Sequence, residues 1–324
     1  SCGNHALLCH SPSRYIIKMA RIFLRACLLL LAFALLPQAM AANVALVLSD
    51  PGGPYAEFAT SFEEYSSKSS WKVSYSGKIE GLSSANSRPE LIIAVGSEAF
   101  RGALASGANT PILATLIPRQ SYEKILAESG RTRPRGSTSA IYLDQPPARF
   151  AAFVKNLLPG TQRVGLLTSD ETRASLPATR QALAGLIVDS EDVLNDASLL
   201  GAINSLMPRV NLLLALPDSS IYKRDNIKAI LVTSYRHQRP VIAFSKAFVS
   251  AGALAAIYSS PSQIARQTND LLNTMGAGIG QLPPPQAPSF FAISINPNVA
   301  QSLNLDVPDE ATMRRTLQAD GGPR

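Results

Sequence analysis

Small polar and acidic residues follow several apolar segments of this chain, at points where a buried strand would end. Asp50 follows the apolar segment Val44–Ser49, and Ser97 comes two residues after Leu91–Val95. In open α/β sheets, ligands bind beyond the carboxyl ends of the strands. Hydroxyls, backbone amides and carboxylates at these ends therefore indicate a small-molecule binding site.

These residue types suit different parts of a small ligand. The amides and hydroxyl around Ser97 suit a carboxylate at a helix N-terminus, and Asp218 suits an ammonium group. Tyr55 or Phe244 suits stacking against an apolar group. The same residue types also have structural roles, because Asp and Ser after strands are ordinary helix N-caps and Tyr55 fits a core position. The candidate ligand-binding residues at the strand ends are Asp50, Tyr55, Ser97, Thr115, Ser169, Asp218 and Phe244.

Patterns typical of catalysis are missing from residues 42–324. The one histidine there, His237, lies at the end of a predicted helix, where its charge would oppose the helix dipole. The sequence has no G-x-S-x-G motif, no P-loop, and no cluster of His or carboxylates at metal-ligand spacing. The glycine run at 276–280 follows a predicted helix, whereas a dinucleotide fingerprint follows a strand. We therefore expect no enzyme activity, no metal and no cofactor.

Apolar segments of strand length alternate with amphipathic segments of helix length, which predicts parallel sheets covered by helices. The predicted strands are Val44–Ser49, Lys72–Tyr75, Leu91–Val95, Ile112–Thr115, Arg163–Thr168, Asn211–Leu216, Pro240–Phe244, Ala253–Tyr258 and Phe290–Ile295. The predicted helices are one opened by Pro54, Ser97–Ala105, Gln145–Leu158, Thr172–Leu186, Ala197–Leu206, Lys223–Arg236, Gln263–Met275 and one opened by Pro297. The Gly-, Pro- and Arg-rich loop Glu128–Gly136 is the expected boundary between two α/β series.

The N-terminal segment has the pattern of an export signal. Arg21 and Arg25 precede the apolar run Leu28–Leu36, Pro37 ends it, and Ala39-Met40-Ala41 has the pattern of a signal-peptidase site. The run is too short to span a membrane. We expect cleavage after Ala41 and a periplasmic protein.

Residues 1–18 precede the signal and resemble a translated leader ahead of Met19, with a genuine N-terminal extension as the alternative. All three cysteines, Cys2, Cys9 and Cys27, lie within residues 1–41, so the exported chain is expected to have no disulfide.

The net charge of +7 suggests a nucleic-acid partner, but its position argues against one. Residues 1–41 contain four basic and no acidic residues, so the charge without them is only +3. The arginines of the loop Glu128–Gly136 have no aromatic residues between them, which is typical of a solvated loop. We therefore expect no nucleic-acid partner.

The second half of the chain resembles a family of ABC-transporter substrate-binding proteins that includes exported tryptophan- and tyrosine-type binders. The resemblance covers about residues 137–312 and is carried by several motifs in the same order. These motifs are Leu158-Pro159 with Arg163–Leu167, Leu216-Pro217-Asp218, Arg239–Ile242, Val249–Leu254, Ser294–Ala300 and Leu303–Pro308.

The resemblance implies an α/β type I periplasmic binding protein fold, with two Rossmann-like lobes whose parallel sheets are joined by crossing hinge strands. Residues 42–136 plus 262–281 are expected to form lobe 1, and residues 137–261 plus 282–324 lobe 2. The ligand would lie in the cleft between the lobes, and hinge closure would be the mechanism.

The same resemblance implies the solute-binding component of an ABC-type importer. A small amino-acid-like ligand, a permease in the inner membrane and a monomeric state are expected. Asp218 carries over in its Pro-Asp motif, and Ser175 carries over where the family has Asn-Ser.

The first lobe departs from the family pattern. The loop Asp50–Tyr55 lacks the family's Gly-Phe, and Arg135–Ser139 replaces its Gly-Asn-x-Thr-Gly phrase. This divergence leaves an alternative open, in which a degenerate binding fold serves as a periplasmic sensor or partner-interaction module.

Overall fold

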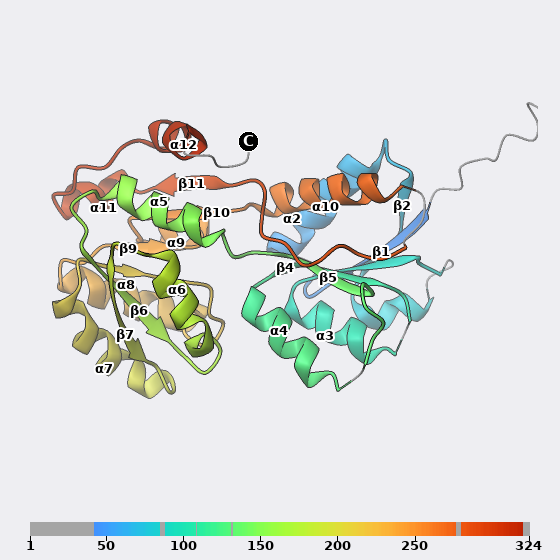
Figure 1. Cartoon of the computed structure of the whole chain (residues 1–324), viewed down its shortest axis with the longest axis horizontal. Helices are drawn as coiled ribbons and strands as arrows, with labels where there is room; N and C mark the ends of the chain where they lie inside the picture. Colours follow the sequence, from blue (N-terminus) through green and yellow to red (C-terminus); the bar gives the residue numbers. More distant parts are fainter. Residues whose placement is uncertain (1–41, 85–87, 108, 131, 277–279, 320–324) are drawn as a thin grey trace, which may run out of the picture. The chain divides into compact units, whose positions relative to one another are not determined.

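The computed structural model describes residues 42–84, 88–107, 109–130, 132–276 and 280–319 (Figure 1). The expected signal peptide, its cleavage after Ala41 and the three cysteines lie outside the described residues. The described residues belong to one compact unit with two separate sheets.

The first sheet has five parallel strands in the order β2-β1-β3-β4-β5. Their bounds are β1 Ala42–Leu48, β2 Trp71–Gly77, β3 Leu91–Val95, β4 Ile112–Ile117 and β5 Thr138–Tyr142. Helices α2 (Gly53–Ser66) and α10 (Pro261–Met275) cover one face, where Phe58, Phe62 and Leu272 are buried. Helices α3 (Ser97–Ala105) and α4 (Arg119–Glu128) cover the other face. Because both faces are covered, the central strands are continuously apolar.

The second sheet has six strands in the order β11-β10-β9-β8-β6-β7, with bounds β6 Arg163–Thr168, β7 Ile187–Asp192, β8 Leu212–Leu214, β9 Val241–Ala243, β10 Ala255–Tyr258 and β11 Ala292–Ile295. All pairs are parallel except β10 and β11, which are antiparallel. One face is covered by α7 (Asp196–Leu206), α8 (Arg224–Arg236) and α9 (Lys246–Ala251). The other is covered by α5 (Pro147–Leu157), α11 (Pro297–Ser302) and α12 (Glu310–Ala319), and α6 (Leu176–Ala182) packs beside them.

Both sheets reverse their strand order at one point, as in doubly wound folds of the 2-1-3-4-5 type. The reversal lies between β1 and β3 in the first sheet and between β6 and β8 in the second. A crevice opens at the carboxyl ends of the strands at such a point. Asp50 and Ser97 follow the two strands of the first reversal, and Ser169 and Asp218 follow those of the second.

Five of the strands and α-helices in the described residues were not predicted from the sequence: β5, β7, α4, α9 and α12. Strand β7 is a half-exposed edge strand with three acidic residues, so it lacks the apolar run that marks a central strand. The helix predicted at Thr172–Leu186 was too long. It consists of a short 3₁₀ turn (Arg173–Ser175) and α6, and Gly185 then adopts a φ of +91° before β7 begins.

Strand β5 and residues 282–286 lie along the edge of the first sheet. Strand β5, assigned from the sequence to lobe 2, pairs with β4 in the first sheet. Residues 282–286 run beside β5, where Leu282 N donates to Gly136 O (2.8 Å) and Tyr142 N donates to Gln286 O (3.0 Å). The first sheet therefore includes β5, and residues 282–286 run along its edge. Three crossing segments, residues 143–146, 259–260 and 287–291, connect the two sheets.

Candidate functional site

A cavity of about 480 Å³ lies between the carboxyl ends of strands from both sheets. Its polar or charged lining residues are Arg119, Gln120, Asp144, Gln145, Thr172, Ser175 and Thr179. Its remaining lining is aromatic, aliphatic and proline-rich, and includes Tyr142, Phe150, Leu216, Phe244 and Ile257. An apolar cavity with a few convergent polar groups is the usual form of a small-molecule site.

The wall from the first sheet is formed by residues that follow β4 and β5. Asp144 Oδ2 accepts a hydrogen bond from the backbone N of Arg119 (2.6 Å), and the Arg119 side chain pairs with Glu123 (Nε–Oε1 2.8 Å). Burial raises the pKa of the Asp144 carboxyl, and it raises the pKa of the Tyr142 phenol to about 12. This wall therefore presents a carboxylate in an environment that disfavours its charge.

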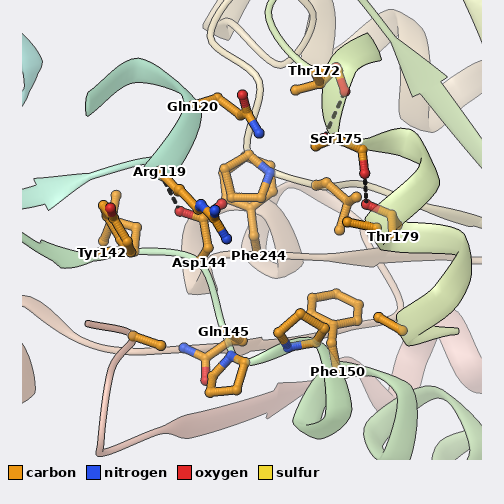
Figure 2. Close-up of a pocket in the computed structure, with 18 of the residues that line it drawn as sticks. Arg119, Gln120, Tyr142, Asp144, Gln145, Phe150, Thr172, Ser175, Thr179 and Phe244 are labelled. Atoms are coloured by element: carbon orange, nitrogen blue, oxygen red, sulfur yellow. Dashed lines mark hydrogen bonds between the residues drawn. The ribbon is translucent and has the colours of Figure 1, made fainter. Parts of the chain in front are cut away.

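The wall from the second sheet presents hydroxyl groups. Ser175 Oγ donates to the carbonyl of Thr172 (2.7 Å), and Thr179 Oγ1 donates to the carbonyl of Ser175 (3.1 Å). Figure 2 shows these residues across the cavity from Arg119 and Asp144, with Phe244 between the two walls. Phe244 packs edge-on against Tyr222 and Phe248, at ring-centroid distances of 5.8 and 5.7 Å.

Asp218 lies behind this wall and does not line the cavity. Its Oδ2 accepts hydrogen bonds from the hydroxyls of Ser169 and Thr172, both at 2.7 Å. Its Oδ1 accepts from the N and Oγ of Ser220 (3.0 and 2.8 Å) and from Ile221 N (3.1 Å). The carboxylate is 3% exposed and organises the loop behind Thr172.

Three predicted residues gather at the reversal point of the first sheet, outside the lining of this cavity. Asp50 Oδ1 accepts from Gly52 N (2.8 Å), which closes a local turn. Tyr55 is half-buried against the core, and burial raises its pKa. Ser97 begins α3, whose Ala99 N donates to Ser49 Oγ (2.9 Å).

Thr115 is fully buried near the end of β4, with no hydrogen-bond partner for Oγ1 among the described residues. Of the eight predicted residues, Ser175 and Phe244 line the cavity, and Ser169 and Asp218 support its second-sheet wall.

Gln145 connects the cavity to the crossing segments. Its Nε2 donates to Ser259 Oγ (2.9 Å), and Ser259 Oγ donates to the carbonyl of Phe290 (2.5 Å). Its Oε1 accepts from Arg149 (2.8 Å), which also donates to the carbonyl of Pro288 (3.1 Å). All three crossing segments thus meet in one hydrogen-bonded network.

A second contact joins the two sheets' loops beside the cavity. Glu171 Oε1 accepts from Ser121 Oγ of α4 (2.8 Å), and Glu171 Oε2 accepts from Ser219 N (3.2 Å) and Ser219 Oγ (2.6 Å). Glu171 follows β6, so its carboxylate links an element of the first sheet to a loop of the second.

Sequence reasoning missed the cavity's first-sheet wall. The residues it missed are Arg119, Gln120, Tyr142, Asp144 and Gln145. The first two begin α4 after β4, and the other three lie in or after β5; neither α4 nor β5 was predicted. A usable signal was present, since Asp144 follows the short apolar run Ala140–Leu143 and precedes Pro146-Pro147. That arrangement is the same strand-end pattern that marked Asp50 and Asp218.

The described residues include no group of three His, Cys, Asp or Glu residues that could hold a metal ion. Within the same part of the chain, no helix has both the length and the apolar character needed to cross a membrane.

Residues 83–316 match the family model for ABC transporter substrate binding protein. The chain belongs to this family. The match includes the whole cavity lining and reaches further into the first lobe than the motifs identified in the sequence. No curated protein matches the sequence.

Solved structures similar to this ABC transporter substrate-binding protein support the fold. A conserved domain protein from Vibrio cholerae has 15% identity and a TM-score of 0.61, covering 85% of this chain and 98% of that one. A streptococcal ABC domain in complex with L-Trp has 13% identity and a TM-score of 0.60, covering 85% and 98%. A ligand-free, open substrate binding protein from Clostridium difficile has 15% identity and a TM-score of 0.62, covering 83% and 96%. The predicted type I periplasmic binding protein fold is confirmed.

Proposed function

We propose that this protein is the periplasmic solute-binding component of an ABC importer and holds a small amino-acid-like ligand in the cavity between its sheets. The observation that carries the proposal is the cavity itself, since its walls come from both sheets and combine apolar surface with few polar groups. Its volume of about 480 Å³ is within the range of small-molecule sites. Closure around the ligand, without catalysis, would present the loaded form to a membrane permease.

A ligand panel tests this proposal. Differential scanning fluorimetry of the purified protein would use L-tryptophan, L-phenylalanine, L-leucine, ribose and myo-inositol. A ligand at a hundredfold excess over its Kd stabilises the folded state by about 2.7 kcal/mol, which shifts the Tm upward. A shift with an amino acid and none with the sugars supports the proposal. No shift with any of them contradicts it and favours a partner-binding role, which a pull-down from periplasmic extract would then test.

Export is tested by intact-mass measurement. We expect the protein expressed with its full N-terminus in a Gram-negative host to appear in the periplasmic fraction, beginning at Ala42. Retention of residues 1–41 in the cytoplasm would contradict the proposed localisation. Size-exclusion chromatography with light scattering on the same material tests the expected monomer.

A further inference from the structure

Asp144 is the one acidic residue among the described residues that line the cavity. Its Oδ2 accepts a backbone hydrogen bond from Arg119, and no described residue forms an ion pair with it within 4.0 Å. The nearby Arg119 guanidinium pairs with Glu123 instead. Asp144 therefore brings a negative charge to the cavity wall that the protein balances only in part.

Partial burial disfavours the charge of this carboxylate. Desolvation raises the pKa of Asp144, and the negative charge of Glu123 acts in the same direction. The hydrogen bonds from the backbone N–H groups of Arg119 and Asp144, and the charge of Arg119, oppose this effect without cancelling it. A cation brought by a ligand would stabilise the ionised form.

Asp218, which the family resemblance favours, is fully occupied by the protein. Five hydrogen bonds from Ser169, Thr172, Ser220 and Ile221 saturate its two oxygens. An ammonium group could reach Asp218 only by displacing hydroxyl groups that organise the wall. The Asp144 carboxylate interacts with the backbone N–H groups of Arg119 and of Asp144 itself, accepts no side-chain hydrogen bond from the described residues, and lies in the lining itself.

The lining around Asp144 indicates the chemical character of the remaining part of the ligand. Tyr142, Phe150 and Phe244 supply aromatic surface, and Leu143, Leu216 and Ile257 supply aliphatic surface. This surface suits an apolar body, and Figure 2 shows Tyr142 and Phe244 on either side of Asp144. The two features together select molecules in which a cationic group is attached to an apolar or aromatic body.

We propose that Asp144 is the cation acceptor of the cavity, so that the protein selects ligands with an ammonium group on an apolar or aromatic body. This inference rests on the proposed function, because it assumes that the cavity is the binding site. It assigns the ammonium group to a residue just after β5, whereas the strand-end pattern of the sequence favoured Asp218 for that group. It also predicts that a carboxylate on the ligand is not required for binding.

Three probes of similar size test the proposal by isothermal titration calorimetry near neutral pH. They are 2-phenylethylamine, L-phenylalanine and 3-phenylpropanoate. We expect the two ammonium-bearing probes to bind and 3-phenylpropanoate to bind at least tenfold more weakly. In Asp144→Asn, binding of the ammonium probes should weaken about ten- to hundredfold, because a hydrogen bond to a charged group is lost. Asp170→Asn, an exposed carboxylate outside the lining, should bind as the wild type does.

The pH dependence of binding separates a charge effect from a structural one. The charged groups facing Asp144 are Arg119 and Glu123, with the neutral phenol of Tyr142 beside them. Affinity for 2-phenylethylamine should fall as the pH is lowered and Asp144 becomes protonated, and this fall should vanish in Asp144→Asn. It should persist in Glu123→Gln, which leaves the Asp144 carboxyl in place. Circular dichroism would establish that each variant is folded.

The outcomes distinguish this inference from the proposed function. Equal binding of 3-phenylpropanoate and 2-phenylethylamine, or unchanged affinity in Asp144→Asn, overturns the role of Asp144 while binding itself persists. Absence of binding for these probes and for every amino acid and sugar of the fluorimetry panel overturns both.

Discussion

Two aspartates near the cavity differ in the hydrogen bonds that their carboxylates accept. Asp218 is buried and its carboxylate oxygens accept five hydrogen bonds, three of them from hydroxyl groups. Asp144 lies in the cavity lining with hydrogen bonds from backbone N–H groups only among the described residues, and burial raises its pKa. The first residue thus contributes to stability, whereas the second lowers stability in the absence of a ligand. This difference leads to two predictions of opposite sign.

Replacing Asp218 by alanine should destabilise the protein by about 3 kcal/mol, because it leaves several buried donors without acceptors. Urea denaturation followed by circular dichroism measures this change. The matched control is Asp170→Ala, since the Asp170 side chain is 93% exposed and its ion pair is with Arg173. That variant should change the free energy of unfolding by less than about 0.5 kcal/mol. Equal stability of the two variants would contradict a structural role for Asp218.

Replacing Asp144 by asparagine should stabilise the ligand-free protein at neutral pH. The pKa of Asp144 is raised in the folded state, so ionisation above that pKa costs folding free energy, and Asn avoids this cost. Asn can still accept the hydrogen bond from Arg119 N. As the pH falls towards the ordinary carboxyl pKa of about 3.9, both side chains become neutral and the advantage of Asn should disappear. Thermal unfolding over a pH series measures this trend.

Asp309 is a carboxylate whose pKa is shifted in the opposite direction, so the same pH series can be applied to it. Hydrogen bonds from Thr312 lower its pKa, so its ionised form favours folding. Asp309→Asn should therefore lose stability at neutral pH, and the loss should shrink as the pH falls through the lowered pKa. If both variants shift stability in the same direction at neutral pH, the assigned environments of these carboxylates are wrong.

At the scale of single elements, Gly96 joins β3 to α3 in a conformation that other residues rarely adopt. Its φ is +98°, and a Cβ at this position would lie 2.4 Å from Ser49 Oγ and 2.6 Å from Tyr55 Cε1. Glycine is needed because the chain turns sharply between the strand and the helix against these side chains.

Gly96→Ala should therefore cost at least about 2 kcal/mol of stability, through the positive φ and the steric overlap. Gly201 is the matched control, because it lies inside α7 with open space around its Cα. Gly201→Ala should stabilise the protein by about 0.5–1 kcal/mol, through helix propensity. Denaturant unfolding of both variants measures the difference. A tolerated Gly96→Ala would contradict the tight packing of this turn.

The elements also show what the sequence could predict. The central strands β3 and β6 were predicted with their observed bounds, because continuous apolar runs mark strands buried on both faces. The edge strands β7 and β5 begin with or contain polar residues that interrupt such a run, and they form by pairing with β6 and β4. Asp144 and Gln145 were not predicted as site residues for the same reason, because a residue can be placed at a strand end only when the strand is recognised.

Residues predicted at strand ends divided between two roles. Ser175 and Phe244 line the cavity, whereas Asp218 and Ser169 bond to each other behind it. A sequence shows that a carboxylate lies at a sheet edge, but it does not show whether neighbouring donors already occupy it. For Asp218, those donors come from two loops, one after β6 and one after β8.

At the scale of the whole molecule, the three crossing segments are connected through Arg149. This arginine is buried in α5 and donates to Gln145 Oε1 and to the carbonyls of Pro288 and Ser289. Its guanidinium lies 5.0 Å from the ring of Phe291, and burial lowers its pKa. Because Gln145 also lines the cavity, the network places a ligand-facing residue in contact with every segment that connects the sheets.

Arg149→Met should loosen these connections and leave both sheets folded. The variant keeps an unbranched side chain and removes the donors to residues 145, 288 and 289, so the crossing segments lose their shared partner. We expect hydrogen–deuterium exchange at residues 143–146 and 287–291 to accelerate at least tenfold, while β3 and β6 keep their protection. Arg266→Met is the matched control, because Arg266 stacks 4.5 Å from the Phe290 ring. It donates no hydrogen bond to the described part of this segment, so its removal should leave exchange there nearly unchanged. Faster exchange throughout both sheets in Arg149→Met would show that the residue stabilises the whole fold and is not specific to the connections.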